Sequence, residues 1–281
     1  MPELPEVETI VRQLGASLPG LRIGDVRIAH PDLIRETPQA FREALNQAEF
    51  TRVSRRGKNI VLDLSGPQVL LVNLGMTGQL LFVPDPPGPG RGSTETAPSH
   101  LALVFTLEPR GSLLYADTRR FGCLRRYSPT EWERESARLG PEPLDPVLTP
   151  ESFHQLLARS RSPIRSWMLD QTRIAGIGNI YASEALFRAG IHPKRSAQSL
   201  SPGESMKLLD AVREVLSDAI RARGTTLRDY RTASGEGGDF GPSLQAYGKE
   251  GVSCSRCNTA IERIVFAKRS AFYCPSCQRE A

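Results

Sequence analysis

Four cysteines near the C-terminal end of the sequence have the spacing of a metal site. Cys254, Cys257, Cys274 and Cys277 form the pattern C-x2-C-x16-C-x2-C. This spacing fits two short turns, each offering two thiolates to one tetrahedral Zn²⁺. A pair of redox dithiols is the alternative, but it calls for a strand–helix–strand context that the flanking sequence lacks. Because four thiolates leave no open coordination position, we expect one structural zinc ion per chain and no catalytic cofactor.

Pro2 and Glu3, at the start of the chain, could carry out a different kind of chemistry. Removal of the initiator methionine would leave Pro2 with a free secondary amine, and an α-amino group titrates at about 7.7–8.0. The unprotonated amine can attack a sugar C1′ carbon and form an iminium ion. Glu3 could protonate the sugar ring oxygen. Taken alone, the pair is better explained by helix capping, since Pro and Glu both suit a first helical turn.

The elements that position these groups follow from the pattern of apolar residues. Helical spacing predicts a helix after the first few residues, with one face formed by Val7, Ile10, Val11, Leu14 and Leu18. Apolar or alternating runs predict the strands of an antiparallel sandwich at residues 21–29, 59–64, 69–74, 79–83, 101–107 and 112–116. Residues 84–98 are rich in Pro and Gly and predict a loop between two strands.

The texture of the sequence changes after about residue 130, where helical periodicity replaces short strands. We expect helices at residues 151–160, 163–170, 179–189 and 202–223. Glycines at 176 and 178 and at 190 separate them. A Gly-rich loop at 234–242 then leads to the cysteine module. The chain is therefore predicted to hold a β-sandwich, a helical domain and a small metal-stabilised module.

Composition and charge set the class of protein. The 281 residues have a net charge of +5 and a pI near 9.1, which weakly favours a polyanionic partner. No run reaches the roughly 18 apolar residues that a membrane span needs, and the acidic start is unlike a secretory signal. We therefore expect a cytoplasmic protein whose cysteines are metal ligands or buried thiols. The fifth cysteine, Cys123, is expected to be a small buried hydrophobic residue.

Six motifs in a fixed order carry a resemblance to a known family. They are Met-Pro-Glu-Leu-Pro-Glu-Val-Glu-Thr (1–9), Arg-Arg-Gly-Lys (55–58), Asn-Leu-Gly-Met-Thr-Gly (73–78), Asp-Thr-Arg-Arg-Phe-Gly (117–122), Gly-Ile-Gly-Asn-Ile-Tyr-Ala (176–182) and the four cysteines. Together they resemble formamidopyrimidine-DNA glycosylase, the bacterial enzyme for oxidised purines. The resemblance extends from residue 1 to about residue 279.

The resemblance implies roles for the residues that match these motifs. Pro2 matches the Schiff-base nucleophile and Glu3 the general acid. Lys58 matches a lysine at a hairpin tip that donates a proton during β-elimination. Arg269 matches a ribbon arginine that binds phosphate near the lesion and takes part in δ-elimination.

Further residues match side chains that contact DNA. Met76, Arg119 and Phe121 match the three that enter the duplex when the damaged nucleotide is flipped out, because the void must be filled and the step wedged. The amides of a Gly-x-Gly-Asn turn suit a phosphate oxygen. The residues expected at the DNA backbone are His100, Arg120, Arg161, Arg165, Gly178 and Asn179.

Two positions depart from the family's pattern. Many relatives have His where this chain has Asn73, and an asparagine can bond phosphate but carries no charge. Thr118 replaces a usual proline before Arg119, which relaxes the turn that presents the wedge. Neither change affects Pro2, Glu3 or Lys58.

The resemblance completes the expected α+β architecture. Residues 1–132 form the sandwich with its flanking helix, 133–233 a helix–two-turns–helix domain, 234–247 a lesion-capping loop and linker, and 248–281 a zinc ribbon. The expected protein is a monomer that excises 8-oxoguanine and formamidopyrimidines from double-stranded DNA, and that cuts the strand there and at abasic sites by β,δ-elimination. The alternatives are an oxidised-pyrimidine glycosylase of the endonuclease VIII type and a non-catalytic protein that binds damaged DNA.

Overall fold

The computed structural model describes residues 2–84, 98–266 and 268–280. It divides into two compact units, one formed by Met1–Ser136 with Arg223–Asp239 and the other by Ala137–Ala222 with Phe240–Ala281. Most of the loop predicted at 84–98 lies outside the described residues. Among the described helices, none combines the length and the hydropathy that a membrane crossing requires.

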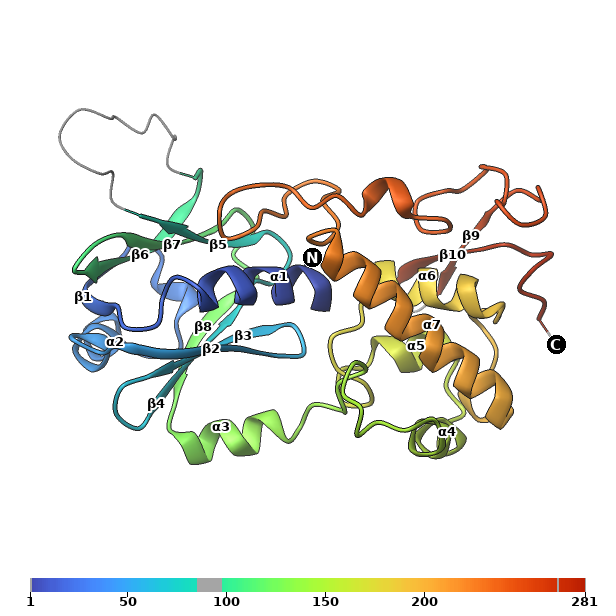
Figure 1. The fold of residues 1–281 in the computed structure, drawn as a ribbon, viewed down its shortest axis with the longest axis horizontal. Coiled ribbons are helices and arrows are strands. Elements are labelled where there is room, and N and C mark those ends of the chain that lie inside the picture. The colour runs from blue at the N-terminus through green and yellow to red at the C-terminus, as the bar shows by residue number, and fades with distance from the viewer. Residues whose placement is uncertain (1, 85–97, 267, 281) are drawn as a thin grey trace. The chain divides into compact units, whose positions relative to one another are not determined.

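Two four-stranded antiparallel sheets form the first unit (Figure 1). One sheet has the order β1-β6-β7-β5 and contains Arg22–Ile28, Leu101–Glu108, Ser112–Asp117 and Gly78–Val83. The other has the order β2-β3-β4-β8 and contains Phe50–Arg56, Asn59–Leu64, Gln68–Asn73 and Cys123–Tyr127. The predicted antiparallel sandwich is confirmed. The prediction lacked β2 and β8 because both are rich in arginine and neither alternates cleanly between apolar and polar residues.

The helix α1, Leu4–Gly15, is anchored by its apolar face. Val7, Ile10 and Leu14 are fully buried in a core that also contains Ile60 and Phe105, one residue from each sheet. This is the helix that the spacing of apolar residues predicted. Burial of one face fixes the rotation of the helix and therefore the direction of its first turn, which carries Glu3 and Glu6.

Two short helices complete the strands of this unit. In α2, Pro38–Leu45, the Thr37 hydroxyl caps the first turn by accepting from Ala40 N at 3.2 Å. α3, Pro129–Ser136, places Trp132 on a small apolar cluster with Val61, Val69 and Leu71. Neither helix was predicted, because eight residues give little periodicity.

The segment Arg223–Asp239 belongs to the first unit although it follows the helices of the second. Ala233 donates its N–H to Gln13 Oε1 at 2.7 Å and accepts from Phe82 N at 2.9 Å, which ties the segment to α1 and β5. The contacts therefore place residues 223–239 in the first unit, whereas the predicted boundaries 133–233 and 234–247 divide this stretch. Those boundaries follow changes in local sequence composition, which cannot detect a chain that returns to an earlier unit.

The second unit contains four helices and a hairpin (Figure 1). The helices are α4 Pro150–Ala158, α5 Ile164–Leu169, α6 Asn179–Ala189 and α7 Pro202–Arg221, and they agree with the predicted ranges within a few residues. Phe153 of α4 and Trp167 of α5 meet edge to face with ring centroids 5.6 Å apart. The hairpin pairs β9, Glu262–Phe266, with β10, Arg269–Tyr273.

Candidate active site and nucleic-acid interface

The N-terminal end of α1 holds Pro2 and Glu3 in a buried, hydrogen-bonded turn. Glu3 is the N-cap residue and forms a reciprocal capping box with Glu6. The Glu6 carboxylate accepts from Glu3 N at 2.8 Å through one oxygen and from Thr225 N at 2.7 Å through the other. A single buried carboxylate therefore joins the backbone beside Pro2 to the returning segment.

Gly224 makes this junction possible. Its φ of +86° is a conformation that side chains rarely adopt, and a Cβ there would lie 3.0 Å from the Glu6 side chain. The Tyr230 hydroxyl lies 3.3 Å from the carbonyl oxygen of Glu6 and 3.1 Å from that of Arg223, as a donor to these acceptors. Burial, followed by the charge of Glu6, raises the pKa of Tyr230 far above its usual value. The tyrosine is therefore a neutral donor at this junction.

Lys58 lies at the tip of the β2–β3 hairpin, as predicted, directly after Gly57 with a φ of +58°. Arg55 connects this tip to α1, donating from Nε to Glu8 Oε2 at 2.9 Å and from Nη1 to Gly57 O at 3.0 Å. Burial alone would raise the pKa of Glu8, but the hydrogen bonds and charges of Arg12 and Arg55 outweigh it and lower the pKa. Glu8 is therefore a stable carboxylate that holds the hairpin to the helix.

Met76 and Phe121 are exposed tips on neighbouring loops. The side chain of Met76 is 40% exposed and that of Phe121 is 59% exposed, so neither belongs to the core. The loops touch at Gly75, where an added Cβ would lie 2.5 Å from the backbone of Phe121. The Arg119 guanidinium lies 4.6 Å from the centroid of the Phe121 ring. The three residues expected to enter the duplex thus form one exposed group.

The buried carboxylate of Asp117 fixes the loop that presents this group. One oxygen accepts from Thr77 Oγ1 at 2.6 Å and from Arg119 N at 3.2 Å, and the other accepts from Gly122 N at 2.8 Å. Thr118 is exposed, and the turn is held on both sides of it without a proline. The relaxation that the loss of proline predicts is therefore opposed by these side-chain bonds.

Arg120 and His100 both have positive φ values, +53° and +62°, and both are exposed. Arg120 forms an exposed ion pair with Asp32 at 3.5 Å, which a phosphate could replace at small cost. The carbonyl of His100 accepts from Asp117 N at 3.2 Å. His100 therefore lies beside residues 117–122, the wedge loop that carries Arg119 and Phe121.

In the second unit, Gln171 clamps the turn before α6. Its amide accepts from Gly176 N at 2.9 Å and donates to Ile177 O at 2.9 Å. Gly178 is the N-cap of α6, and Asn179 is the first residue of the helix. The predicted Gly-x-Gly-Asn turn therefore stands at a helix N-terminus, where the helix dipole favours an anion.

Arg165 does not have the exposure expected of a residue that contacts DNA. It is 0% exposed, and its guanidinium bonds Asn179 Oδ1 and Ser270 O and stacks on the Phe266 ring at 4.9 Å. Burial, with the nearby charge of Arg269, lowers the pKa of Arg165 to about 10. In this structure Arg165 holds Asn179 against the hairpin, whereas Arg161 and Arg269 are exposed.

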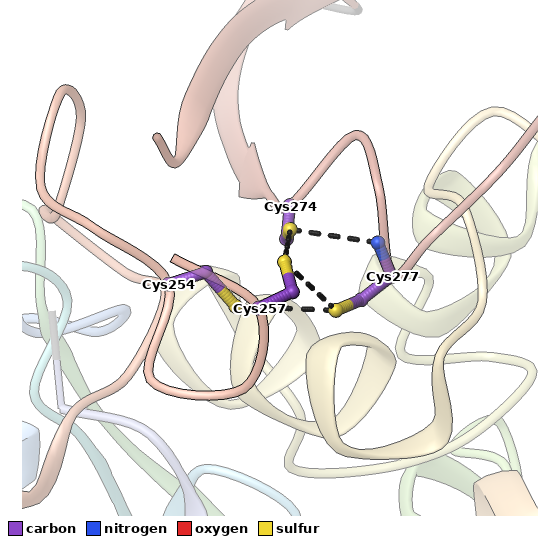
Figure 2. A group of neighbouring side chains, drawn as sticks. All are labelled: Cys254, Cys257, Cys274 and Cys277. Atoms are coloured by element: carbon purple, nitrogen blue, oxygen red, sulfur yellow. Dashed lines mark hydrogen bonds between the residues drawn. The ribbon is translucent and has the colours of Figure 1, made fainter. Parts of the chain in front are cut away.

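The four cysteines come together at one end of the β9–β10 hairpin, and their sulfur atoms point toward one another (Figure 2). All four Sγ atoms lie within 4.8 Å of one another: Cys257 is 3.4 Å from Cys274 and 3.5 Å from Cys277, and Cys254 is 4.0 Å from Cys277. Tetrahedral zinc with Zn–S bonds of about 2.3 Å needs sulfurs about 3.8 Å apart. The donor set fits one structural zinc ion.

Glu184 secures the peptide that leads into this module. Its buried carboxylate accepts from three successive amides, Gln245 N at 3.0 Å, Ala246 N at 2.9 Å and Tyr247 N at 2.7 Å. Sequence reasoning missed Glu184, Glu6, Asp117 and Gln171 as supporting residues, because each acts through partners that local spacing does not reveal. Cys123, predicted to be buried, is only half-buried, since it lies on the edge strand β8.

Comparisons with known proteins cover nearly the whole chain. Three domain families match in succession: the formamidopyrimidine-DNA glycosylase N-terminal domain over residues 1–124, the formamidopyrimidine-DNA glycosylase H2TH domain over 139–231, and the zinc finger found in FPG and IleRS over 253–279. The formamidopyrimidine-DNA glycosylase of Thermomicrobium roseum is 44% identical, and the alignment covers 99% of each chain. That of Herpetosiphon aurantiacus is 42% identical over 99% of this chain and 100% of its own.

Solved structures give the same result. A complex between a Lactococcus lactis mutant enzyme of this type and DNA containing Fapy-dG has a TM-score of 0.90 and 31% identity. The complex of the Lactococcus lactis enzyme with DNA containing an abasic site has a TM-score of 0.89 and 30% identity. Both cover 99% of this chain and 100% of the other.

The sandwich with its leading helix, the helical unit and the four-cysteine hairpin define a zinc-finger DNA glycosylase. Such enzymes act in base excision repair and also cleave the strand at abasic sites. The chain belongs to the formamidopyrimidine-DNA glycosylase family.

Proposed function

We propose that Pro2 is the nucleophile with which this protein removes oxidised purines, 8-oxoguanine and formamidopyrimidines, from duplex DNA. The observation that carries the proposal is the turn at the start of α1, where Glu6 fixes Glu3 beside Pro2. Relatives with this architecture include Lactococcus lactis enzymes in complexes with Fapy-dG-containing and abasic DNA. After loss of Met1, the secondary amine forms a bond to C1′ while the glycosidic bond breaks and the base leaves.

Glu3 protonates the sugar ring oxygen, so that the ring opens and the amine lone pair forms an iminium ion with C1′. The iminium acidifies C2′, whose proton is lost as the 3′ phosphate departs in β-elimination. Lys58, at the hairpin tip, donates a proton in this step, and Arg269 assists departure of the 5′ phosphate in δ-elimination. Hydrolysis of the iminium then releases the sugar fragment and returns Pro2.

Met76, Arg119 and Phe121 fill the void that the flipped base leaves, which the exposure of Met76 and Phe121 and the contact between Arg119 and Phe121 support. Backbone phosphates are bound by His100, Arg120, Arg161, Arg269 and the Gly178–Asn179 turn, and Arg165 supports Asn179. The protein acts in the bacterial cytoplasm and as a monomer, in keeping with its charge and composition.

Glu3→Gln separates the proposed roles. It should abolish excision of 8-oxoguanine opposite cytosine, measured by single-turnover strand cleavage, while duplex binding is kept. An unchanged excision rate would exclude Glu3 as the acid. Parallel assays on oxidised-pyrimidine duplexes test a second candidate function, the excision of oxidised pyrimidines. This candidate is considered because a similar Lactococcus lactis protein is known in complex with DNA that contains an oxidised pyrimidine.

A further inference from the structure

Asn73, one of the departures from the family's pattern, uses both ends of its side-chain amide inside the protein. It is the last residue of β4 and pairs with Asn59, the first residue of β3. Its Nδ2 donates to Asn59 Oδ1 at 2.7 Å, and its Oδ1 accepts from Gly75 N at 2.9 Å. The side-chain amide of Asn73 therefore bridges the start of β3 and the loop after β4, and it does not point its NH2 and its oxygen into solvent.

The bridge extends in both directions to groups that face the DNA. Asn59 Nδ2 donates to Arg56 O at 3.2 Å, which closes the hairpin turn that contains Lys58. At the other end, Gly75 directly precedes Met76. Three hydrogen bonds thus run in series from the Lys58 turn to the Met76 loop. The orientation of each amide is fixed, because the series starts at a carbonyl and ends at an N–H.

The far end of the series is itself immobilised. Gly75 has a φ of +55° and lies so close to the backbone of Phe121 and Gly122 that a Cβ would clash with both at 2.5 Å. Its N–H cannot move to a new acceptor without disturbing the wedge loop. Any strain applied to Met76 is therefore transmitted through Gly75 to Asn73.

We propose that Asn73 is a positioning residue that couples the placement of Lys58 to the seating of Met76 in the duplex. The proposal rests on the roles assigned above to Lys58 and Met76. It limits the expected phosphate contact of Asn73 to one remaining N–H, because Oδ1 and the other N–H of the amide have partners within the protein. Strand cleavage with Lys58 as the proton donor is then efficient only when the Met76 loop holds its position.

The test is a set of variants that cut different links in the chain of bonds. In Asn73→Ser the hydroxyl can still accept from Gly75 N, but it is too short to reach Asn59, so only the link toward Lys58 is lost. In Asn73→Ala both links are lost. Asn59→Ala removes the link toward Lys58 from the other side, together with the bond from Asn59 Nδ2 to Arg56 O. Asn46→Ala, at an exposed asparagine after α2, is the matched control.

The measured quantities are the single-turnover rate of strand cleavage on DNA with a preformed abasic site, the duplex Kd and its salt dependence. Asn73→Ser should slow cleavage about tenfold, the worth of one hydrogen bond, and Asn59→Ala should slow it at least as much, with the Kd nearly unchanged in both. The Asn73→Ser/Asn59→Ala double variant should be no slower than Asn59→Ala alone, because Asn59→Ala already removes the link that Asn73→Ser removes. Asn46→Ala should cleave at the wild-type rate.

Two results would overturn the proposal. One is a raised Kd with a smaller salt slope and an unchanged cleavage rate, which is the signature of a lost phosphate contact. The other is additive slowing in the double variant, which would show that the two asparagines act independently. A wild-type protein that fails to cleave abasic DNA would refute the proposed function instead, so the two failures are distinct.

Discussion

Arg55 donates from Nε to Glu8 Oε2 at 2.9 Å, and this ion pair joins the helix that begins beside Pro2 to the hairpin that carries Lys58. The same guanidinium holds the carbonyl of Gly57 at the hairpin tip. Arg55 is 10% exposed and Glu8 is 20% exposed, so water screens the pair only in part. This carboxylate therefore contributes to the relative placement of Pro2 and Lys58, the proposed nucleophile and proton donor.

Glu8→Gln should lower the free energy of unfolding at pH 7 by about 1.5–3 kcal/mol, the range for a hydrogen bond to a charged group. Because folding lowers the pKa of Glu8, its contribution is present above the ordinary value of 4.5 and is lost as the pH falls below it. Urea unfolding at several pH values should show the difference from wild type shrinking in acid. The exposed Glu133→Gln is the control, and a pH-independent difference would contradict the assignment.

Phe121→Ala should leave stability within about 0.5 kcal/mol of wild type, because the ring is mostly exposed. It should slow excision of 8-oxoguanine by about 10- to 100-fold, since the wedge no longer offsets the few kcal/mol of unstacking. Thermal melting and single-turnover excision are the measurements. Val147→Ala, at a residue 81% exposed in the second unit, is the control for loss of a surface apolar group. Equal excision by both variants would exclude the wedge.

Glu184→Gln tests the junction that leads to the zinc module. An amide offers one acceptor oxygen where the carboxylate accepts from three backbone N–H groups, so we expect a loss of about 1–3 kcal/mol. Hydrogen exchange at Gln245, Ala246 and Tyr247 should become faster. Glu214→Gln, exposed on α7, should leave these amides protected. Unchanged hydrogen exchange in Glu184→Gln would show that residues 245–247 keep their structure without the Glu184 carboxylate.

Removal of zinc should unfold the four-cysteine module, because so short a segment cannot bury a sufficient core. Cys274→Ser, at a buried ligand, should release zinc in a colorimetric assay and weaken DNA binding together. Cys123→Ser should retain stoichiometric zinc and wild-type binding. Loss of zinc with full DNA binding would contradict a structural role in presenting Arg269.

The parts of the molecule that the sequence predicted are those encoded by local spacing. The four cysteines stand in one short segment, and the apolar face of α1 repeats every three or four residues. The hairpin tip at Lys58 follows from the resemblance carried by the short motif Arg-Arg-Gly-Lys at 55–58. Such features need no knowledge of distant partners.

The parts that the sequence did not predict depend on contacts between distant residues. The sequence does not distinguish Arg165 from the exposed arginines near it. Only its contacts with Phe266 and Asn179 in the structure show that it is buried. Glu6 acquires its role from Thr225, 219 positions away. Bonds of this kind leave no pattern in a single sequence.

Borohydride trapping followed by peptide mapping tests the central claim most directly. Wild-type protein incubated with 8-oxoguanine duplex and borohydride should give a covalent protein–DNA adduct, and mass spectrometry should locate the reduced sugar on the nitrogen of Pro2. An adduct on Lys58 or another lysine, or efficient base removal by protein whose terminal amine has been blocked, would contradict the mechanism.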